Sequence, residues 1–387
     1  MITITRNLPY ISPSGNPMVI KVLTDNHMSG GVRRPFYTIF LEIYVSGVLI
    51  RTESVEPDGG GNAEFDISEI IRGQLTPAVV KSFSGTVYTQ HSSDAYVTFY
   101  CNIKEGYGAP LSKSGTLAFT GSKYAVVGGF SDSLLEQIES TGGNQYIFLD
   151  ANRIFLTNQP TFKRTNANQP EFLRFLRTDE PADTYKVMLE QYGIGGNVLS
   201  LTTLETFDPS TNLVFTIDVT TGSKVTINPL AAEWAVWISN VTTNEDVTER
   251  LYYKWDERND AHKRYVVFRN SLGGYDSVCF VGAMSTNLES EPVIGNSLIV
   301  TNLRRAIVPT KERSLTQEVL VGAIGYNSNE ELKWLRDLFN SEEVWLVGDN
   351  WERLRLRNTE SLGSTDTAPG TFDVEADKGV PDFFLTS

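Results

Sequence analysis

The chain has 387 residues, a formal net charge of −14, 40% hydrophobic residues and 21% charged residues. This length exceeds what one hydrophobic core usually supports, so we expect roughly two to four domains of a soluble globular protein. Nucleic acids and anionic membranes are bound through clustered lysine and arginine, and the acidic balance argues against both as partners. The sequence has no apolar run approaching the ~20 residues of a membrane span, and its first residues lack the charged and apolar regions of a signal peptide.

The first 120 residues contain short segments in which apolar and polar residues alternate. Residues 37–45 are the clearest example, and residues 97–103 repeat the pattern. Gly47 and the segment 57–62, which reads Pro-Asp-Gly-Gly-Gly-Asn, supply turns between such segments. Short strands separated by turns at this spacing are typical of antiparallel β-sandwiches. We therefore predict an N-terminal β-sandwich over residues 1–120.

Residues 121–170 have mixed character and are predicted to form a connector that ends in a loop rich in proline and asparagine. Residues 171–300 are predicted to form a second β-sandwich region. Its segment from Tyr185 to Phe215 follows the order of strands and turns found from Tyr37 to Phe65, with similar spacing. Duplication of one module explains this similarity, and so does the general spacing of any two sandwiches. The sequence leaves both explanations open.

Residues 264–282 predict a β-hairpin, with which the second sandwich region ends. Two runs of β-branched and aromatic residues flank a dense block of turn residues. The predicted structural turn comprises Asn270, Gly273, Gly274 and Asp276, because glycine tolerates positive φ and Asn or Asp side chains bond to their own backbone. A phosphate-binding loop is the alternative interpretation of the paired glycines, but strand formers follow them where such a loop needs the start of a helix.

The C-terminal residues 301–387 are predicted to form an α+β assembly domain. The sequence of residues 328–331, Ser-Asn-Glu-Glu, is a capping box and opens an amphipathic helix. A later strand alternates leucine with Arg353, Arg355 and Arg357. Three guanidinium groups on one strand face form either a solvated basic row or a subunit interface that meets an acidic surface of a neighbouring copy.

Signals for catalysis, cofactors and metals are weak. His27, His91 and His262 lie in polar, turn-rich segments and are expected to be exposed, with no nucleophile or metal-binding pattern around them. Cys101 and Cys279 lie far apart in apolar segments and are interpreted as buried thiols, with a single bridge as the alternative. We therefore predict that the protein is not an enzyme and has no catalytic residues, no cofactor and no metal. A pair of glycosidase carboxylates is the remaining catalytic alternative.

Three places in the chain resemble tail and baseplate structural proteins of bacteriophages that infect Bacteroidetes. They are the hairpin Phe268-Arg-Asn-Ser-Leu-Gly-Gly-Tyr-Asp276, the stretch Gln169-Pro-Glu-Phe-Leu173 that follows Phe155-Leu-Thr157, and the C-terminal unit from 329–335 through 344–346 to Trp351. The resemblance implies a distal-tail-like protein of immunoglobulin-like modules that assemble around the tail tip. It implies contact with copies of itself and with other virion tail proteins, after assembly in the host cytoplasm.

The predicted fold class is mainly β, with tandem immunoglobulin-like β-sandwich modules and a C-terminal α+β unit that contains one amphipathic helix. The predicted function is that of a virion structural protein in a bacteriophage tail or baseplate, with no nucleic acid partner and no membrane insertion. The alternative is a carbohydrate-binding surface or adhesion module. Such a module stacks a host surface glycan on exposed aromatic side chains such as Trp351 or Tyr107.

Overall fold

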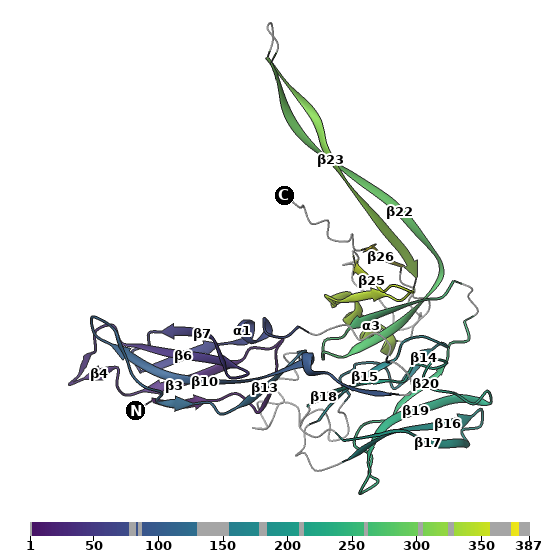
Figure 1. Cartoon of the computed structure of the whole chain (residues 1–387), viewed down its shortest axis with the longest axis horizontal. Coiled ribbons are helices and arrows are strands. Elements are labelled where there is room, and N and C mark those ends of the chain that lie inside the picture. Colours follow the sequence, from purple (N-terminus) through teal and green to yellow (C-terminus); the bar gives the residue numbers. More distant parts are fainter. Residues whose placement is uncertain are drawn as a thin grey trace.

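Strands form most of the chain. The computed structural model describes residues 2–76, 83, 87–129, 155–177, 184–208, 213–258, 262–300, 305–323, 329–356 and 373–378, and between 282 and 323 it describes the backbone only. Figure 1 shows a first sandwich at one end, a second sandwich at the other, and a barrel that lies against the second sandwich and carries a long two-stranded projection. Within the described residues, no helix is long and apolar enough to cross a membrane.

The first sandwich packs two sheets face to face. Its smaller sheet has the order β1 (Ile2–Arg6), β3 (Val19–Thr24), β8 (Asn62–Asp66), and its larger sheet has the order β2 (Ile11–Pro13), β13 (Lys123–Val126), β10 (Tyr96–Tyr107), β6 (Thr38–Val45), β7 (Val48–Val55). Alternation along β6 directs Ile39, Leu41 and Ile43 into the core between the sheets, where they are buried. The pattern of residues 37–45 therefore matches the buried face of this strand.

Short elements complete this part of the chain. They are β4 (Met28–Ser29), β5 (Val32–Arg33), α1 (Ser68–Arg72), a 3-10 helix (Ser93–Ala95), β11 (Ser112–Lys113) and β12 (Ala118–Phe119). Both β11 and β12 pair with β10 and extend the larger sheet.

The second sandwich is built in the same way. Its larger sheet has the order β14 (Phe162–Thr165), β20 (Leu251–Trp255), β19 (Ala231–Asn240), β16 (Tyr185–Gly193), β17 (Val198–Phe207), and its smaller sheet has the order β15 (Phe172–Leu176), β18 (Val214–Asp218), β9 (Thr89–His91). The strand β9 comes from the sequence span of the first sandwich. One hydrophobic cluster also contains Ile11 and Val126 of the first sandwich together with Phe175 and Phe215 of the second. The two sandwiches therefore share part of their core.

The two larger sheets repeat one strand order. At one edge of each sheet, a strand pairs in parallel with the last strand of its sandwich: β2 with β13 in the first, and β14 with β20 in the second. At the opposite edge lies a hairpin, β6–β7 in the first sheet and β16–β17 in the second. Tyr37 directly precedes β6 and Tyr185 begins β16, while Phe65 lies in β8 and Phe215 in β18. The spacing that suggested an internal repeat thus links strands at equivalent positions in the two sandwiches.

The sheets do not follow the domain boundaries expected from the sequence. The strands β13 and β14 lie inside the expected connector 121–170, yet β13 belongs to the first sandwich and β14 to the second. Residues 130–154 of that connector lie outside the described residues. The hairpin at 264–282 belongs to the barrel, because β21 (Arg264–Arg269) pairs with both β22 (Tyr275–Val300) and β24 (Val344–Leu346). Local sequence specifies a hairpin, but pairing with distant strands decides its sheet.

The barrel closes in the order β21, β22, β23 (Arg305–Ala323), β26 (Asp373–Lys378), β25 (Glu352–Leu356), β24. The expected amphipathic helix is α3 (Asn329–Asn340), whose Trp334, Leu335 and Leu338 are buried in one cluster with Phe268 of β21. Ser328 of the predicted capping box lies outside the described residues. The predicted fold class is confirmed: the chain is mainly β, with tandem immunoglobulin-like sandwich modules and a C-terminal α+β unit that contains this helix.

The strands β22 and β23 continue beyond the barrel as a two-stranded ribbon, which we define as residues 285–300 and 305–318 (Figure 1). Its ladder runs from Ser285 opposite Val321 to Val300 opposite Arg305. Pairing with β21 ends at Phe280, and pairing with β26 is confined to residues 319–323. In the part of the chain that the structure describes, the ribbon therefore has no neighbouring strand on either edge.

The two cysteines are buried thiols in different units. Cys101 lies in β10 and Cys279 in β22, and no disulfide joins them. Burial raises the pKa of Cys101 to about 12.

We expect neither thiol of the native protein to react readily with Ellman's reagent, whereas both should react in guanidinium chloride, as followed by absorbance. Rapid reaction of one thiol in the native protein would contradict this burial.

Candidate functional site

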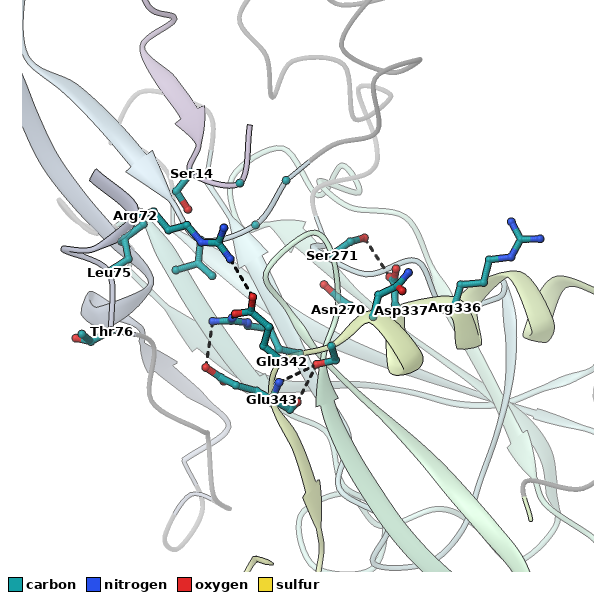
Figure 2. A pocket seen from close by; sticks show the side chains of 17 residues that line it. Ser14, Arg72, Leu75, Thr76, Asn270, Ser271, Arg336, Asp337, Glu342 and Glu343 are labelled. Carbon is teal, nitrogen blue, oxygen red and sulfur yellow. Dashed lines mark hydrogen bonds and ion pairs between the residues drawn. The ribbon is translucent and has the colours of Figure 1, made fainter. Parts of the chain in front are cut away.

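The three segments that carry the resemblance meet at one place in the fold. Residues 155–157 and 163–174 belong to the second sandwich, residues 268–277 form the first hairpin of the barrel, and residues 331–337 lie in α3. Residues 127–129, at the end of the first sandwich, contact the same hairpin. We call this place the three-way junction, since all three units contribute to it. Figure 2 shows a cleft on its solvent side.

The predicted turn joins β21 to β22. The backbone amide of Asn270 donates to the carbonyl oxygen of Gly274 at 2.9 Å, and the amide of Gly273 donates to that of Asn270 at 3.1 Å. The Asn270 side chain accepts from the Gly274 amide at 2.9 Å, and Gly273 has a φ of +88°. These three residues lie in the turn with the local chemistry expected of them. Asp276 differs, because it lies in β22 and its side chain bonds to Thr157 and Trp334 as well as to Asn270 of the turn.

The paired glycines also allow two other backbone segments to approach the turn closely. A Cβ atom on Gly273 would lie 2.0 Å from the carbonyl oxygen of Val127, and one on Gly274 would lie 2.0 Å from that of Leu156. On the facing segment, a Cβ atom on Gly128 would lie 2.3 Å from the carbonyl oxygen of Leu272. Glycine is therefore required here by packing between units as well as by the turn.

Asp276 is the buried acceptor at the centre of the junction. Its Oδ1 accepts from Thr157 Oγ1 at 2.6 Å, while its Oδ2 accepts from Asn270 Nδ2 at 3.0 Å and from Trp334 Nε1 at 2.8 Å. Burial raises the pKa of Asp276, and the charge of Lys163 together with the three hydrogen bonds opposes this shift. One carboxyl group thus connects the second sandwich, the turn and α3.

A second buried network pairs Lys163 of β14 with Glu171. The Nζ atom of Lys163 lies 2.5 Å from Glu171 Oε2, and both side chains are almost completely buried. The Oε1 atom of this glutamate also accepts from Thr165 at 2.9 Å, from Gln169 at 3.2 Å and from Ser277 of β22 at 3.1 Å. Because Ser277 belongs to the barrel, the buried ion pair fixes the barrel relative to the second sandwich.

Two arginines add contacts between units. Arg164 of β14 forms a bidentate ion pair with Glu331 of α3, with Nη2 at 2.7 Å from Oε2 and Nε at 3.0 Å from Oε1. Arg174 of β15 is buried, donates from Nη1 to the carbonyl oxygen of Gly273 at 2.7 Å, and lies 4.9 Å from the centre of the Tyr275 ring. Burial lowers the pKa of Arg174. Its Nε and Nη2 atoms have no hydrogen-bond partner among the described residues.

A cleft of about 890 Å³ opens on the solvent side of the junction (Figure 2). Arg72 Nη2 lies 3.2 Å from Glu342 Oε1, and Arg269 Nη1 lies 3.2 Å from Glu343 Oε1. These arginines are compensated by carboxylates, and the residues that line the cleft include no histidine or cysteine. The cleft thus provides one ion pair between the first sandwich and the barrel, Arg72 with Glu342, and one within the barrel unit. Its lining contains no thiol or imidazole that could act as a catalytic nucleophile or base.

Part of the predicted basic row lies within the described residues. Arg353 and Arg355 of β25 are exposed, while Leu354 between them is buried. Arg357 lies outside the described residues. The Nη2 atom of Arg353 donates to the carbonyl oxygen of Glu342 at 3.0 Å, so this guanidinium has a partner within the chain. The role of the row as a subunit interface stays a prediction.

The two aromatic residues considered as glycan platforms differ in their surroundings. Trp351 is partly buried and packs against Phe172, with ring centres 6.3 Å apart. Tyr107 is 42% exposed and stacks on Tyr37, and the guanidinium of Arg34 lies 4.5 Å from the centre of its ring. Trp351 is therefore a packing residue, and Tyr107 already carries a cation over its ring.

The three histidines lie in separate segments with different exposure. His27, expected to be exposed, is only 7% exposed, because its Nδ1 lies 2.8 Å from the carbonyl oxygen of Thr24 and its Nε2 lies 3.3 Å from that of Gly59. His91 is partly buried and His262 is exposed. Among the described residues, no group of three or more His, Cys, Asp and Glu side chains is placed to hold a metal ion.

Neither buried network is apparent from the sequence alone. One signal was present, because Glu171 and Asp276 each adjoin apolar strand residues, and a charged residue in a buried strand needs a partner. The identity of the partner depends on how distant segments pack. Lys163 and Trp334 therefore could not be named in advance.

No family model and no curated protein matches this chain. Among solved structures, it is similar to the crystal structure of CBD12 from CALX1.2, with 10% identity, 63% of this chain and 82% of that chain covered, and a TM-score of 0.21. It is also similar to the calcium binding domain CBD12 of CALX1.1, with 11% identity, 66% of this chain and 100% of that chain covered, and a TM-score of 0.20. Both TM-scores are too low to carry an argument about this chain.

Proposed function

We propose that the protein is a structural component of a bacteriophage tail or baseplate. It assembles in the host cytoplasm with copies of itself and with other tail proteins, and it acts in the virion by contact. The main support for this role is the two-stranded ribbon that projects from the barrel (Figure 1).

An isolated two-stranded ribbon is marginally stable in water. Among the described residues, this ribbon has no sheet beside it along residues 285–300 and 305–318. Both of its edges offer unpaired backbone N–H and C=O groups, which pair readily with a further strand. A monomeric protein protects such edges, whereas a subunit of an assembly uses them as contacts. The ribbon therefore favours a role in which a neighbouring subunit covers it.

The far end of the ribbon is apolar in sequence. Residues 298–300 read Leu-Ile-Val, and Ile307 and Ala306 pair with Leu298 and Ile299. Because successive residues of a strand lie on opposite faces, consecutive apolar residues occupy positions on both faces of the ribbon. Apolar positions gathered in this way usually mark an interaction surface. Contact with a neighbouring subunit covers them.

The three-way junction supports a role that depends on fixed geometry. The networks at Asp276 and Glu171 and the glycine contacts hold the sandwiches and the barrel together. The direction of the ribbon relative to the sandwiches is therefore set within each subunit, as a symmetric assembly requires. The net charge of −14 keeps free subunits soluble before they assemble.

Shortening the ribbon should abolish self-assembly without unfolding the subunit. The variant joins Leu288 to Glu318 through an Asn-Gly turn, because these residues face each other in the ladder just beyond the part of β23 that pairs with β26, and the turn suits a two-residue connection. We expect size exclusion with light scattering to give the mass of a monomer for this variant and of an oligomer for the unshortened chain. Both should have the same midpoint of urea unfolding.

Two outcomes would count against this role. If the unshortened chain stays monomeric at every concentration, self-assembly is wrong, and if the shortened variant still assembles, the ribbon is not the contact. Antibody labelling of purified phage particles that contain the protein tests the virion role separately. Labels should lie on the tail in electron micrographs, and labels confined to the capsid would exclude a tail protein.

A further inference from the structure

The outer faces of the two larger sheets carry the same kinds of side chains. On each face, three aromatic rings lie in a row beside a glutamate, which accepts from a tyrosine hydroxyl and pairs with a cation. We call these groups the first and the second aromatic face.

The first aromatic face lies on β6, β10 and β12. Tyr44 and Tyr100 stack with ring centres 4.8 Å apart, and Phe119 meets Tyr100 edge-on at 5.4 Å. Glu42 accepts from the Tyr44 hydroxyl at 3.1 Å and lies 2.7 Å from Lys104 Nζ. Phe119 is 52% exposed. The last ring of the row is therefore open to solvent.

The second aromatic face lies on β16, β20 and β14. Phe162 stacks on Tyr252 with ring centres 5.0 Å apart, and Tyr252 lies 6.3 Å from Tyr192. Glu190 accepts from the Tyr192 hydroxyl at 2.6 Å and from Arg250 Nη1 at 2.9 Å. Phe162 is 46% exposed. This row also ends in a ring that is open to solvent.

The two faces are assembled from partly different strands. Their glutamate and tyrosine occupy equivalent positions of β6 and β16. The cations do not correspond, because Lys104 belongs to β10 whereas Arg250 directly precedes β20. The exposed ring likewise comes from β12 in one face and from β14 in the other. A shared fold alone does not require this repeated composition.

Sheet stability explains only part of the arrangement. Cross-strand aromatic pairs stabilise a sheet by themselves, which accounts for the stacking of Tyr44 on Tyr100. Stabilisation of the sheet does not explain why Phe119 and Phe162 are at these positions, because each of these side chains leaves about half of its surface in water. Aromatic rings that lie beside a few fixed polar groups are typical of binding surfaces.

Charge indicates the class of ligand. On the first face, Lys104 pairs with Glu42, and Lys113 lies over the neighbouring Phe40 ring. On the second face, Arg250 is shared between Glu190 and Asp246. Among these residues, neither face carries more than one uncompensated charge, in a chain of net charge −14. Such a face lacks the cationic surplus that an anionic polymer needs, and a second copy of this acidic chain brings no complementary charge to it. A neutral sugar polymer fits, since its C–H faces contact the rings while its hydroxyls accept from the cations.

We propose that the two aromatic faces bind a neutral polysaccharide, with one stretch of sugar residues at each face. Phe119 and Phe162 stack on sugar rings, and the more exposed Lys104 and Arg250 donate hydrogen bonds to sugar hydroxyls, while Glu42 and Glu190 hold these cations in place. Two similar sites on one chain suit a ligand with a repeating structure, because binding at the first site raises the effective concentration at the second. This binding does not depend on the ribbon.

Affinity electrophoresis tests the two faces in native gels that contain mixed-linkage β-glucan, mannan or dextran, with alginate as the acidic comparison. At least one neutral polymer should retard the wild-type chain, and alginate should not. Phe119→Ala and Phe162→Ala should each raise the apparent Kd at least about tenfold, and the double variant should show no retardation, because both sites are lost. Leu230→Ala removes a 74% exposed apolar side chain outside both faces and should bind like the wild type.

Several results would overturn the proposal. They are no retardation by any neutral polymer, unchanged retardation of the double variant, and retardation by alginate alone. If the double variant instead loses oligomer mass in light scattering and its retardation is unchanged, the faces join protein subunits. Equal urea midpoints for all variants serve as the folding control. The variant with the shortened ribbon should keep full retardation, so a failure of glycan binding is distinguishable from a failure of ribbon-mediated assembly.

Discussion

Replacing Gly273 with alanine should lower the free energy of unfolding by about 3–5 kcal/mol, or prevent folding of the chain. Its φ of +88° is unfavourable for any residue with a Cβ atom, by about 1–2 kcal/mol. The added Cβ would also lie 2.0 Å from the carbonyl oxygen of Val127, so the first sandwich would have to move away from the barrel. Urea unfolding followed by tryptophan fluorescence measures the loss.

Gly59→Ala is the matched control for this substitution. Nothing lies within 4 Å of the Cβ atom that it would add, so we expect a change below about 1 kcal/mol in either direction. If Gly273→Ala changes the unfolding free energy no more than Gly59→Ala, the approach of Val127 to the turn is not a fixed part of the fold. The junction would then not set the direction of the ribbon.

The sequence alone predicts the features that are set by residues close together in the chain. Alternation along residues 37–45 identifies the buried face of β6, because the face of each residue depends only on its position in the strand. The exposure of Arg353 and the burial of Leu354 follow in the same way. The turn at Asn270 and Gly273 follows from backbone conformations that few residues adopt.

The sequence does not predict which sheet a strand joins, and the reason is physical. The strand β9 reads Thr-Gln-His and pairs with β18, although it lies between α1 and β10 in the chain. Its polar residues show no alternation, and its pairing partner is more than a hundred positions away. The hairpin at 264–282 is the same kind of case, since its turn is specified locally but its third strand, β24, comes from after the helix. Such pairings depend on the whole fold.

In the candidate sites, too, local sequence predicts some features, and the pairing of distant segments decides the others. Asp276 was assigned to the turn because aspartate beside glycines is common there, yet the fold uses it as a buried acceptor for Trp334 and Thr157. On the first aromatic face, alternation places Glu42 and Tyr44 on the outer side of β6, but nothing local brings Phe119 beside them. Composition and alternation thus identify single side chains, while a site arises only when distant strands pair.

The second large effect is expected at the buried ion pair. Lys163→Met should lower the free energy of unfolding by about 3–5 kcal/mol, because Glu171 would remain buried without its counter-charge. Both side chains are almost completely buried, and Lys163 Nζ lies 2.5 Å from Glu171 Oε2. Lys21→Met is the matched control. Its partner Glu64 lies 2.8 Å away but both side chains are about half exposed, so the expected loss is about 0–1 kcal/mol.

Adding Glu171→Gln to Lys163→Met should recover a large part of the lost stability. The amide is neutral, and its oxygen still accepts from Ser277 and Thr165, which donate to the carboxylate in the wild type. Removing the uncompensated charge therefore relieves the main penalty while the contact to the barrel remains. Chemical denaturation of the two single variants and the double variant gives the coupling energy. A double variant as unstable as the sum of the single variants would show that the charges do not act as a pair, and that packing alone fixes the barrel on the second sandwich.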